Sequence, residues 1–360
     1  NTNTASNLTA VGYQALYSNT TGVNNTVVGY KAAYTNTGGE GNTVVGLSAL
    51  YYNSTGYYNT AIGVSAGFYN QTGVQNVLIG YGSGGADGVT TNSFNNNVAV
   101  GYISLGKVTT GYTNTALGYR SAYNTTTGIE NVAVGGNALY TNSTGSLNTA
   151  IGKDALYTNT ASNLTAVGYQ SLYQNTTGVG NVAVGYYSAG SNTTGANNTV
   201  VGLYALQFNQ IGTGNTAIGT YTAGQGNGSV ASFSDTTAIG YAAANKNLGS
   251  QNTAVGSLSL YNNTASNLTA VGFQSLFSNT IGQSNTAVGN YALASNTTGT
   301  SNSAFGKSAL YTNTTGVNNT ACGIAALYYN QTGSSNTAVG YASQYNVTTG
   351  NYNTSVGQWS

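Results

Sequence analysis

The feature that most constrains this chain is a repeat that runs through all 360 residues. A tripeptide of the Ala-Val-Gly type recurs 21 times, and most of its glycines lie 17 residues apart; a few intervals are 16 residues and two are 21. No linker or change of composition interrupts the series. A fixed period of this length is typical of a solenoid in which each repeat forms one coil. We therefore expect one continuous array over residues 1–360.

The averaged repeat reads Asn-Thr-Ala-Val-Gly-Tyr-x-Ala-Leu-Tyr-x-Asn-Thr-Thr-Gly-x-x, and its residues are called positions one to seventeen. Positions two to four are short and rich in β-branched residues, which favours a strand. A second extended run is expected at positions seven to ten, as in residues 14–17. Asn-Thr-Thr-Gly is turn chemistry. The repeat thus predicts an all-β fold, a parallel β-solenoid of about 21 coils stacked about 4.8 Å apart.

Stacking of this kind explains the composition. Only six Lys/Arg and five Asp/Glu are present, 3% of the chain. In a stack each side chain lies over its counterpart, so a charge would meet a like charge in the next coil, whereas Asn, Thr and Tyr can bond or stack with their own kind. Asn occupies position one in 17 of 21 repeats. We therefore predict a continuous amide ladder there, although an Asn that merely solvates a turn would give the same pattern.

The two faces of the strand can also be assigned from the pattern. Position four is bulky and apolar, so we expect it to point into the coil, and Cys322, which takes this position once, is expected to be a buried and inert thiol. Position three, mostly Ala, would then lie on the opposite face. A strand without a polar face is normally covered on both sides. This predicts a partner chain against the Ala ladder; the alternative is that small Ala side chains are tolerated next to solvent.

Composition also excludes several classes of function. The chain has no His, Pro or Met and one Cys, so neither a Ser-His-Asp set nor a Cys/His metal cluster can form. We expect no enzyme, and no catalytic, cofactor-binding or metal site. A net charge of +1 gives no field for nucleic acid, and the apolar stretches are too short to insert into a membrane. Because it starts at Asn1 without Met or an export signal, the chain is expected to be a segment of a longer protein.

The repeats resemble the head repeats of YadA-type trimeric autotransporter adhesins. The shared element is an Asn-Thr/Val-Ala-Ile/Val-Gly strand followed by a small residue, as in residues 59–66 and 131–138, and it recurs in every coil. Similar repeats occur in phage tail-fibre-like proteins. The resemblance implies a left-handed parallel β-roll, assembly as a homotrimer and a role in adhesion. Those heads typically have coils about three residues shorter than these.

Two repeats are four residues too long, residues 81–101 and 220–240, and each carries a Ser-Phe pair and an isolated acid. These repeats are candidate surface-contact loops, because loops on rigid scaffolds often bind ligands; the interpretation that we favour is a bulge that its Phe anchors against the roll. A lone Asp offers too few oxygens to bind calcium. The candidate contact residues are Asp87, Phe94, Phe233 and Asp235.

Tyr recurs at positions six and ten, which predicts stacked aromatic ladders. These could bind sugars or an apolar surface, or could simply cover the edge of the coil. Asn-x-Ser/Thr sequons mark an arm that we expect to be exposed, although any repeat written in Asn and Thr contains them. The candidate glycosylation sites are Asn19, Asn53, Asn142, Asn175 and Asn313.

These features favour a structural or adhesive fibre segment of a cell-surface appendage or adhesin head, located outside the cell, at its surface or in a virion fibre. The expected partners are further copies of the chain, in a homotrimer or an end-to-end filament, and a glycan or host-surface ligand. The alternatives are a self-assembling extracellular filament subunit, a phage tail-fibre shaft and an ice-binding solenoid. Ice binding favours two parallel Thr rows, and the predicted strand offers one.

Overall fold

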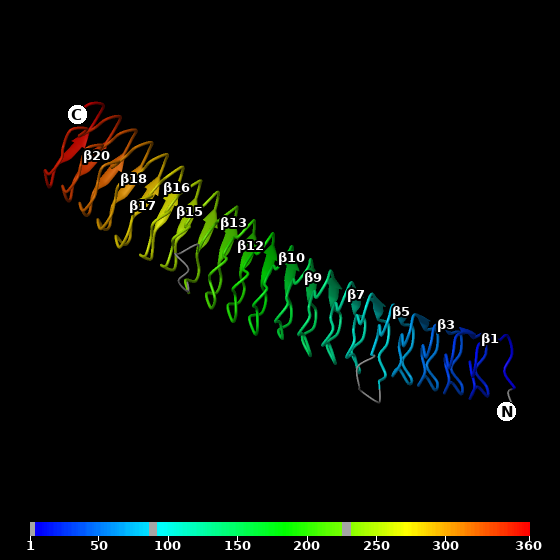
Figure 1. The fold of residues 1–360 in the computed structure, drawn as a ribbon. Helices are drawn as coiled ribbons and strands as arrows, with labels where there is room; N and C mark the ends of the chain where they lie inside the picture. Colours follow the sequence, from blue (N-terminus) through cyan, green and yellow to red (C-terminus); the bar gives the residue numbers. More distant parts are fainter. Residues whose placement is uncertain (1–3, 86–91, 225–231) are drawn as a thin grey trace. The chain divides into compact units, whose positions relative to one another are not determined.

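The computed structural model describes residues 4–85, 92–224 and 232–360. Every strand in these ranges is three residues long and occupies positions two to four of a repeat. The strands stack in parallel (Figure 1), so the prediction of an all-β parallel solenoid with a period near 17 residues is confirmed. The described residues contain no helix, and so none that could cross a membrane.

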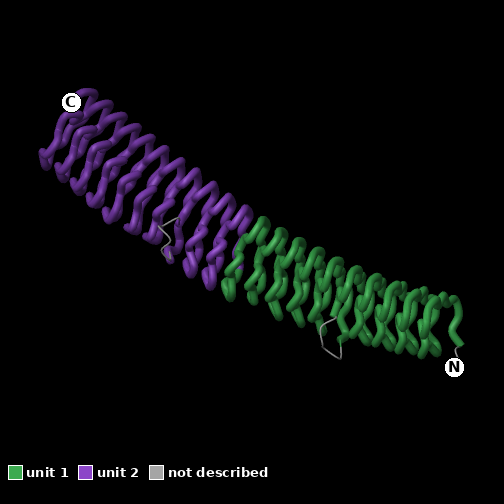
Figure 2. The backbone as a smooth tube through the Cα atoms, viewed as in Figure 1, with its two compact units in different colours: residues 1–179 green, residues 180–360 purple. Residues whose placement is uncertain are grey.

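The chain divides into two compact units, residues 1–179 and 180–360 (Figure 2). The first unit contains β1 (Thr9–Val11), β2 (Thr26–Val28), β3 (Thr43–Val45), β4 (Thr60–Ile62), β5 (Val77–Ile79), β6 (Val98–Val100), β7 (Thr115–Leu117), β8 (Val132–Val134), β9 (Thr149–Ile151) and β10 (Thr165–Val167). The second contains β11 (Val182–Val184), β12 (Thr199–Val201), β13 (Thr216–Ile218), β14 (Thr237–Ile239), β15 (Thr253–Val255), β16 (Thr269–Val271), β17 (Thr286–Val288), β18 (Ser303–Phe305), β19 (Thr320–Cys322), β20 (Thr337–Val339) and β21 (Thr354–Val356).

Within each unit successive strands keep the same register. Thr9 pairs with Thr26, and the same one-to-one pairing continues from strand to strand. The two long repeats do not disturb it: Val77 of β5 pairs with Val98 of β6, and Thr216 of β13 pairs with Thr237 of β14. The four extra residues are therefore accommodated between the strands, and each strand residue lies over its own equivalent.

Positions seven to ten form a turn, so the prediction of a second strand there is wrong. The backbone is left-handed at positions seven and nine, with φ of 55° at Gln14 and 50° at Leu16. Ala49 and Leu50, at positions eight and nine, are both fully buried. Neighbouring residues of a strand point to opposite faces, whereas the turn directs both into the coil. The Leu16 amide donates to the Ala32 carbonyl of the next coil at 3.1 Å, so the turns also stack in register.

The strand faces the opposite way from the prediction. Position three is buried in every strand between β1 and β21, while no position-four side chain is buried. The coil is thin, and Leu at position nine fills much of its interior from the turn side. Only a small residue fits opposite it, so Ala points inward and the bulkier Val or Ile points outward. The Ala ladder is therefore core, and it cannot be the surface for a partner chain.

One coil shows how tightly this interior is filled. Leu78 replaces Ala at position three, and both adjacent position-nine residues are glycine. A Cβ added to Gly67 would lie 2.7 Å from the Leu78 Cδ1 atom, and one added to Gly84 would lie 2.5 Å from Cδ2. The large residue has moved from the turn to the strand, and the filled volume is kept, as expected for close packing.

Candidate interaction surfaces

Two amide ladders run through the interior. The one predicted at position one is confirmed over runs of coils, and it is interrupted at Leu164, Thr236 and Leu268, where only the backbone amide donates to the preceding Asn. Asn42 donates from Nδ2 to Oδ1 of Asn25 at 3.2 Å, and Asn59 bonds Asn42 in the same way at 3.1 Å. The second ladder lies at position twelve, where the repeat indicated only a turn. There Asn53 donates to Oδ1 of Asn36 at 2.7 Å. Both ladders meet at one carbonyl, because Asn42 and Asn53 each donate to the Gly56 oxygen, at 3.0 and 3.1 Å. This shared bond closes the Asn-Thr-Thr-Gly arm onto the start of the strand.

The candidate glycosylation sites belong to this second ladder, so the prediction that they lie on an exposed arm is wrong. All five have at most 2% of their surface exposed. The Nδ2 atom, which would carry a glycan, is engaged inside the coil: that of Asn313 donates to Asn296 Oδ1 at 2.8 Å and to the Gly316 oxygen at 3.1 Å. The folded coil leaves no room for a sugar at these atoms. The residues concerned are Asn19, Asn53, Asn142, Asn175 and Asn313.

The outward-facing side chains at positions two and four form what we call the outer sheet face. Its position-four column is Val or Ile in most coils, and Val45, Ile62 and Val339 are each 38% exposed. Its position-two column is Thr in 16 of the 21 strands. Neither column contains an ionisable group other than the Cys322 thiol. The face is thus a regular, uncharged and largely apolar strip along each unit.

Thr hydroxyls differ between this face and the arm. At position thirteen the hydroxyl bonds to the next coil: Thr20 Oγ1 donates to the Thr37 carbonyl, and Thr37 Oγ1 donates to the Ser54 carbonyl, both at 3.1 Å. On the described strands the position-two hydroxyls, such as that of Thr26, make no hydrogen bond within the chain. A row of hydroxyls on the outer sheet face is therefore available to something outside the coil.

Cys322 lies on this face, so the prediction of a buried thiol is wrong. It is exposed in β19. Its neighbours in the position-four column are Phe305 of β18, 43% exposed, and Val339 of β20. The error follows from the orientation of the strand, because position four was expected to point inward.

The Tyr residues stack as predicted. At position ten the ring centroids of Tyr17 and Tyr34 are 5.2 Å apart with an interplanar angle of 3°, and Tyr34 and Tyr51 are 5.1 Å apart. Most position-ten rings are half-buried, which agrees with a cover over the coil edge. Stacked rings present their edges outward, whereas sugars bind aromatic faces, so these runs are poorly shaped for a glycan. Partial burial among other phenols raises the pKa of Tyr328 and of Tyr345.

The aromatic cover moves between two positions. In several coils without a ring at position ten, position seven carries one: Tyr187 lies over Gly190, and a Cβ on that glycine would collide with the ring. The same exchange places Tyr204 beside Gln207 and Tyr291 beside Ala294. Cations also rest on these rings. Five of the six Lys/Arg side chains lie within 6 Å of a Tyr ring centroid, namely Lys31, Lys107, Arg120, Lys153 and Lys246.

The long repeats do not present their Phe residues. Phe94 and Phe233 are at most 1% exposed, and Nδ2 of Asn76 donates to the Phe94 carbonyl at 2.8 Å. The favoured prediction, that each Phe anchors its long coil against the roll, is confirmed, and the alternative, that these rings contact a ligand, is wrong. Asp235 is exposed, and its amide donates to the Thr213 carbonyl at 2.9 Å. Asp87 lies outside the described residues. Among those described, no three His, Cys, Asp or Glu side chains gather into a metal site.

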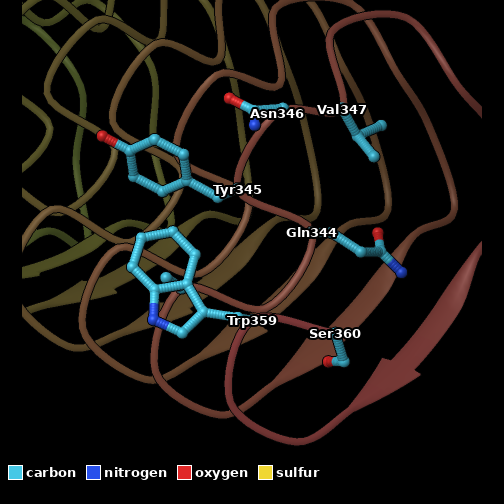
Figure 3. A pocket seen from close by; sticks show the side chains of 7 residues that line it. Gln344, Tyr345, Asn346, Val347, Trp359 and Ser360 are labelled. Carbon is cyan, nitrogen blue, oxygen red and sulfur yellow. The ribbon is translucent and has the colours of Figure 1, made fainter.

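A shallow pocket of about 330 Å³ lies among Ala342, residues 344–347, Trp359 and Ser360 (Figure 3). These residues occupy positions seven to twelve of one coil and positions seven and eight of the next. In the preceding coils these positions are covered by the coil that follows. The pocket is therefore the top of a stacked layer, and its lining shows no gathering of reactive groups.

The described residues thus form Asn and Tyr ladders, a stack of turns and one regular outward face. The chain matches no protein-family model and no curated protein. A function has to be argued from these surfaces alone.

Proposed function

We propose that the chain is a non-enzymatic shaft segment of an extracellular fibre, in a cell-surface appendage, an adhesin head or a phage tail fibre. The observation that carries this proposal is that the same bonds between neighbouring coils recur along each unit. From coil to coil the backbone, the Asn amides and the position-thirteen Thr hydroxyls bond to the neighbouring coil. Such an array gains interactions with each added coil and has no special centre, which suits a spacer more than a catalyst.

The chemistry of the side chains supports an exposed location. Almost nothing in the chain titrates near neutral pH, since it has no His and only 3% charged residues. Folding of such a chain is insensitive to salt and to moderate pH, because those conditions act mainly on charges. The absence of His also removes the usual general base, and no cluster of carboxylates replaces it among the described residues.

Self-association into a homotrimer or an end-to-end filament, and adhesion to a glycan or host surface, belong to the same proposal as its finer parts. The stacked rings favour an apolar or protein surface over a sugar, for the geometric reason given above. An end-to-end filament would be favoured by strand edges left open at the ends of a stack.

The shaft function is tested by changing the number of coils. Deleting residues 285–335 removes three complete coils and joins equivalent positions. The particle should remain folded, and electron microscopy should show a rod shortened by about 14 Å. Deleting residues 285–327 instead joins positions that are out of phase, and this control should lose thermal stability. Compact particles, or an in-phase deletion that unfolds like the control, would contradict a shaft.

A further inference from the structure

No described element of the chain covers the outer sheet face. This face combines a column of Val and Ile side chains with a column of unbonded Thr hydroxyls. Ordinary monomers seldom expose a long contiguous apolar strip, and one that is present usually marks an interaction site. We propose that this face is the surface through which a second copy of this chain packs lengthwise.

The size of the face meets the requirement of a stable complex. Each unit stacks ten or eleven strands, which gives a strip about 50 Å long from the usual strand spacing. With the width of two outward columns and their rim, the strip covers about 700 Å² per unit, close to the 800 Å² per partner of a standard interface. One unit by itself therefore approaches the necessary area.

The chemistry of the face is complementary to itself. Positions two and four carry no charged side chain in the chain, so two copies meet without the repulsion that like charges would cause. The Val and Ile side chains supply the apolar centre. The Thr hydroxyls can donate to and accept from the same residues of the other copy, as Thr pairs do across strands.

An aromatic rim borders part of the same face, since position six is Tyr or Phe in ten of the 21 repeats and Lys in two. Position six follows the strand by two residues, and the Lys31 amide donates to the Tyr13 carbonyl at 2.8 Å, so the extended ladder continues past Gly12. The position-six rings are exposed; Tyr81 has 53% of its surface accessible and stacks on Tyr102 at 5.3 Å. Tyr is enriched in protein interfaces, where its ring packs and its hydroxyl stays wet.

Ice is the competing occupant of a Thr-rich sheet, and the irregularities of the face favour a protein. The position-four column changes from Val to Leu117, Phe305 and Cys322, and position two is Val in four strands. A water lattice requires the same group in every coil. A copy of the chain, in contrast, carries the same irregularities and can be complementary to them. The raised Tyr rim also suits an interface more than a flat crystal plane.

Mass measurement tests this proposal directly. Analytical ultracentrifugation of the 36.4 kDa chain at micromolar concentration should give two or more chains per particle. In the variant Val288→Glu/Val339→Glu the two new charges lie three coils, about 14 Å, apart, so they add little repulsion within one chain at 0.15 M salt. This variant should sediment as a single chain. The matched control Thr298→Glu/Thr349→Glu has the same spacing on the exposed arm, and it should associate like the wild type.

Cys322 gives a second measurement that needs no substitution. It is exposed in the single chain, so a maleimide should label it rapidly when the protein is dilute. In the associated state the face is covered, and we expect labelling to slow about tenfold, since thiol reactivity follows exposure. Circular dichroism of each variant establishes that it is folded.

The proposal is overturned by a single-chain mass at every concentration with rapid Cys322 labelling. It is equally overturned if the arm variant dissociates as readily as the face variant, or if the folded face variant stays associated. A single chain that reshapes growing ice crystals would assign the face to ice instead. None of these results affects the shaft function, which the coil-deletion experiment tests independently, because a monomeric rod is still a shaft.

Discussion

The strand wall is formed by positions one to five of each repeat, and the turn wall by positions seven to ten. The two walls keep their place in the coil by different means. The strand wall hardly varies, since Gly closes it in every repeat and Ala fills most of position three. The turn wall exchanges residues freely and carries its aromatic ring at position seven or at position ten. Backbones of adjacent coils approach closely along the strand, where a single atom matters. Along the turn, side chains can be exchanged as long as their total volume still fills the coil.

Two adjacent glycines, one at the end of the strand wall and one just beyond it, give the largest expected difference. A Cβ on Gly135 would lie 2.7 Å from the Gly152 oxygen, and the φ of Gly135 is +130°, whereas a Cβ on Gly136 would have no atom within 4 Å. Gly135→Ala should lower the free energy of unfolding by about 4 kcal/mol, through collision and backbone strain.

Gly136→Ala is the matched control and should stay within about 0.5 kcal/mol of the wild type. Urea titration followed by circular dichroism measures both. Equal effects of the two substitutions would mean that the strand backbones do not approach as closely as described.

Volume exchange across the interior gives the next largest effect. Leu78→Ala should cost about 3 kcal/mol, because it leaves a cavity between two glycines of the turn wall. Gly67→Leu alone should also destabilise the protein, since its side chain would meet Leu78.

The double variant restores the usual pairing of Ala at position three with Leu at position nine. Thermal melts should place it above Leu78→Ala. A double-mutant cycle with no favourable coupling would show that volume is not shared between the two walls.

The repeat alone predicted much of this architecture. The glycine period fixed the coil, and Asn at position one indicated its ladder, because both features depend only on each residue meeting its equivalent. The faces of the strand were not predictable from the strand itself. Either Val11 or Ala10 could point inward, and the bulk of Leu16 on the opposite wall determines which of the two does. A turn that buries two consecutive residues, at φ values that Leu seldom adopts, has no strong sequence signal.

The surface features were likewise predicted only in part. The Tyr stacks were predicted because stacking is again a matter of equivalence between coils. The sequons were misread because a buried Asn ladder and a solvated Asn turn have the same letters. One signal could have separated them: Asn at position twelve recurs while the neighbouring position eleven varies freely, as in Asn36 beside Thr35 and Asn53 beside Tyr52.

Loss of one rung from an Asn ladder should have a moderate effect. Asn302 donates to Asn285 Oδ1 at 3.2 Å and to the Gly316 carbonyl at 2.8 Å, and its Oδ1 accepts from the Asn319 amide at 3.0 Å. Asn302→Ala should lower the free energy of unfolding by about 2 kcal/mol, because buried groups lose their partners. The exposed Asn290→Ala is the control and should be nearly neutral. Equal melting temperatures of the two variants would contradict the ladder's role.

The smallest expected effect is the dependence of stability on pH, which differs between the two walls because they contain different ionisable groups. The strand wall contains one ionisable group, the thiol of Cys322, while the turn wall contains the tyrosines. Partial burial raises the pKa of Tyr328 and of Tyr345 above the ordinary phenol value of 10.0, so the folded state holds the phenolic proton more tightly than the unfolded state. Their contribution to stability is thus fully present below pH 10 and is lost as the pH rises through the higher folded-state pKa.

With five carboxylates in 360 residues, the stability should change little between pH 5 and pH 9. Melting temperatures recorded from pH 4 to pH 11 should be flat and then fall at the alkaline end, and Tyr328→Phe/Tyr345→Phe should reduce that fall. A marked loss of stability on the acid side instead would mean that the few carboxylates, and not the phenols, govern the response.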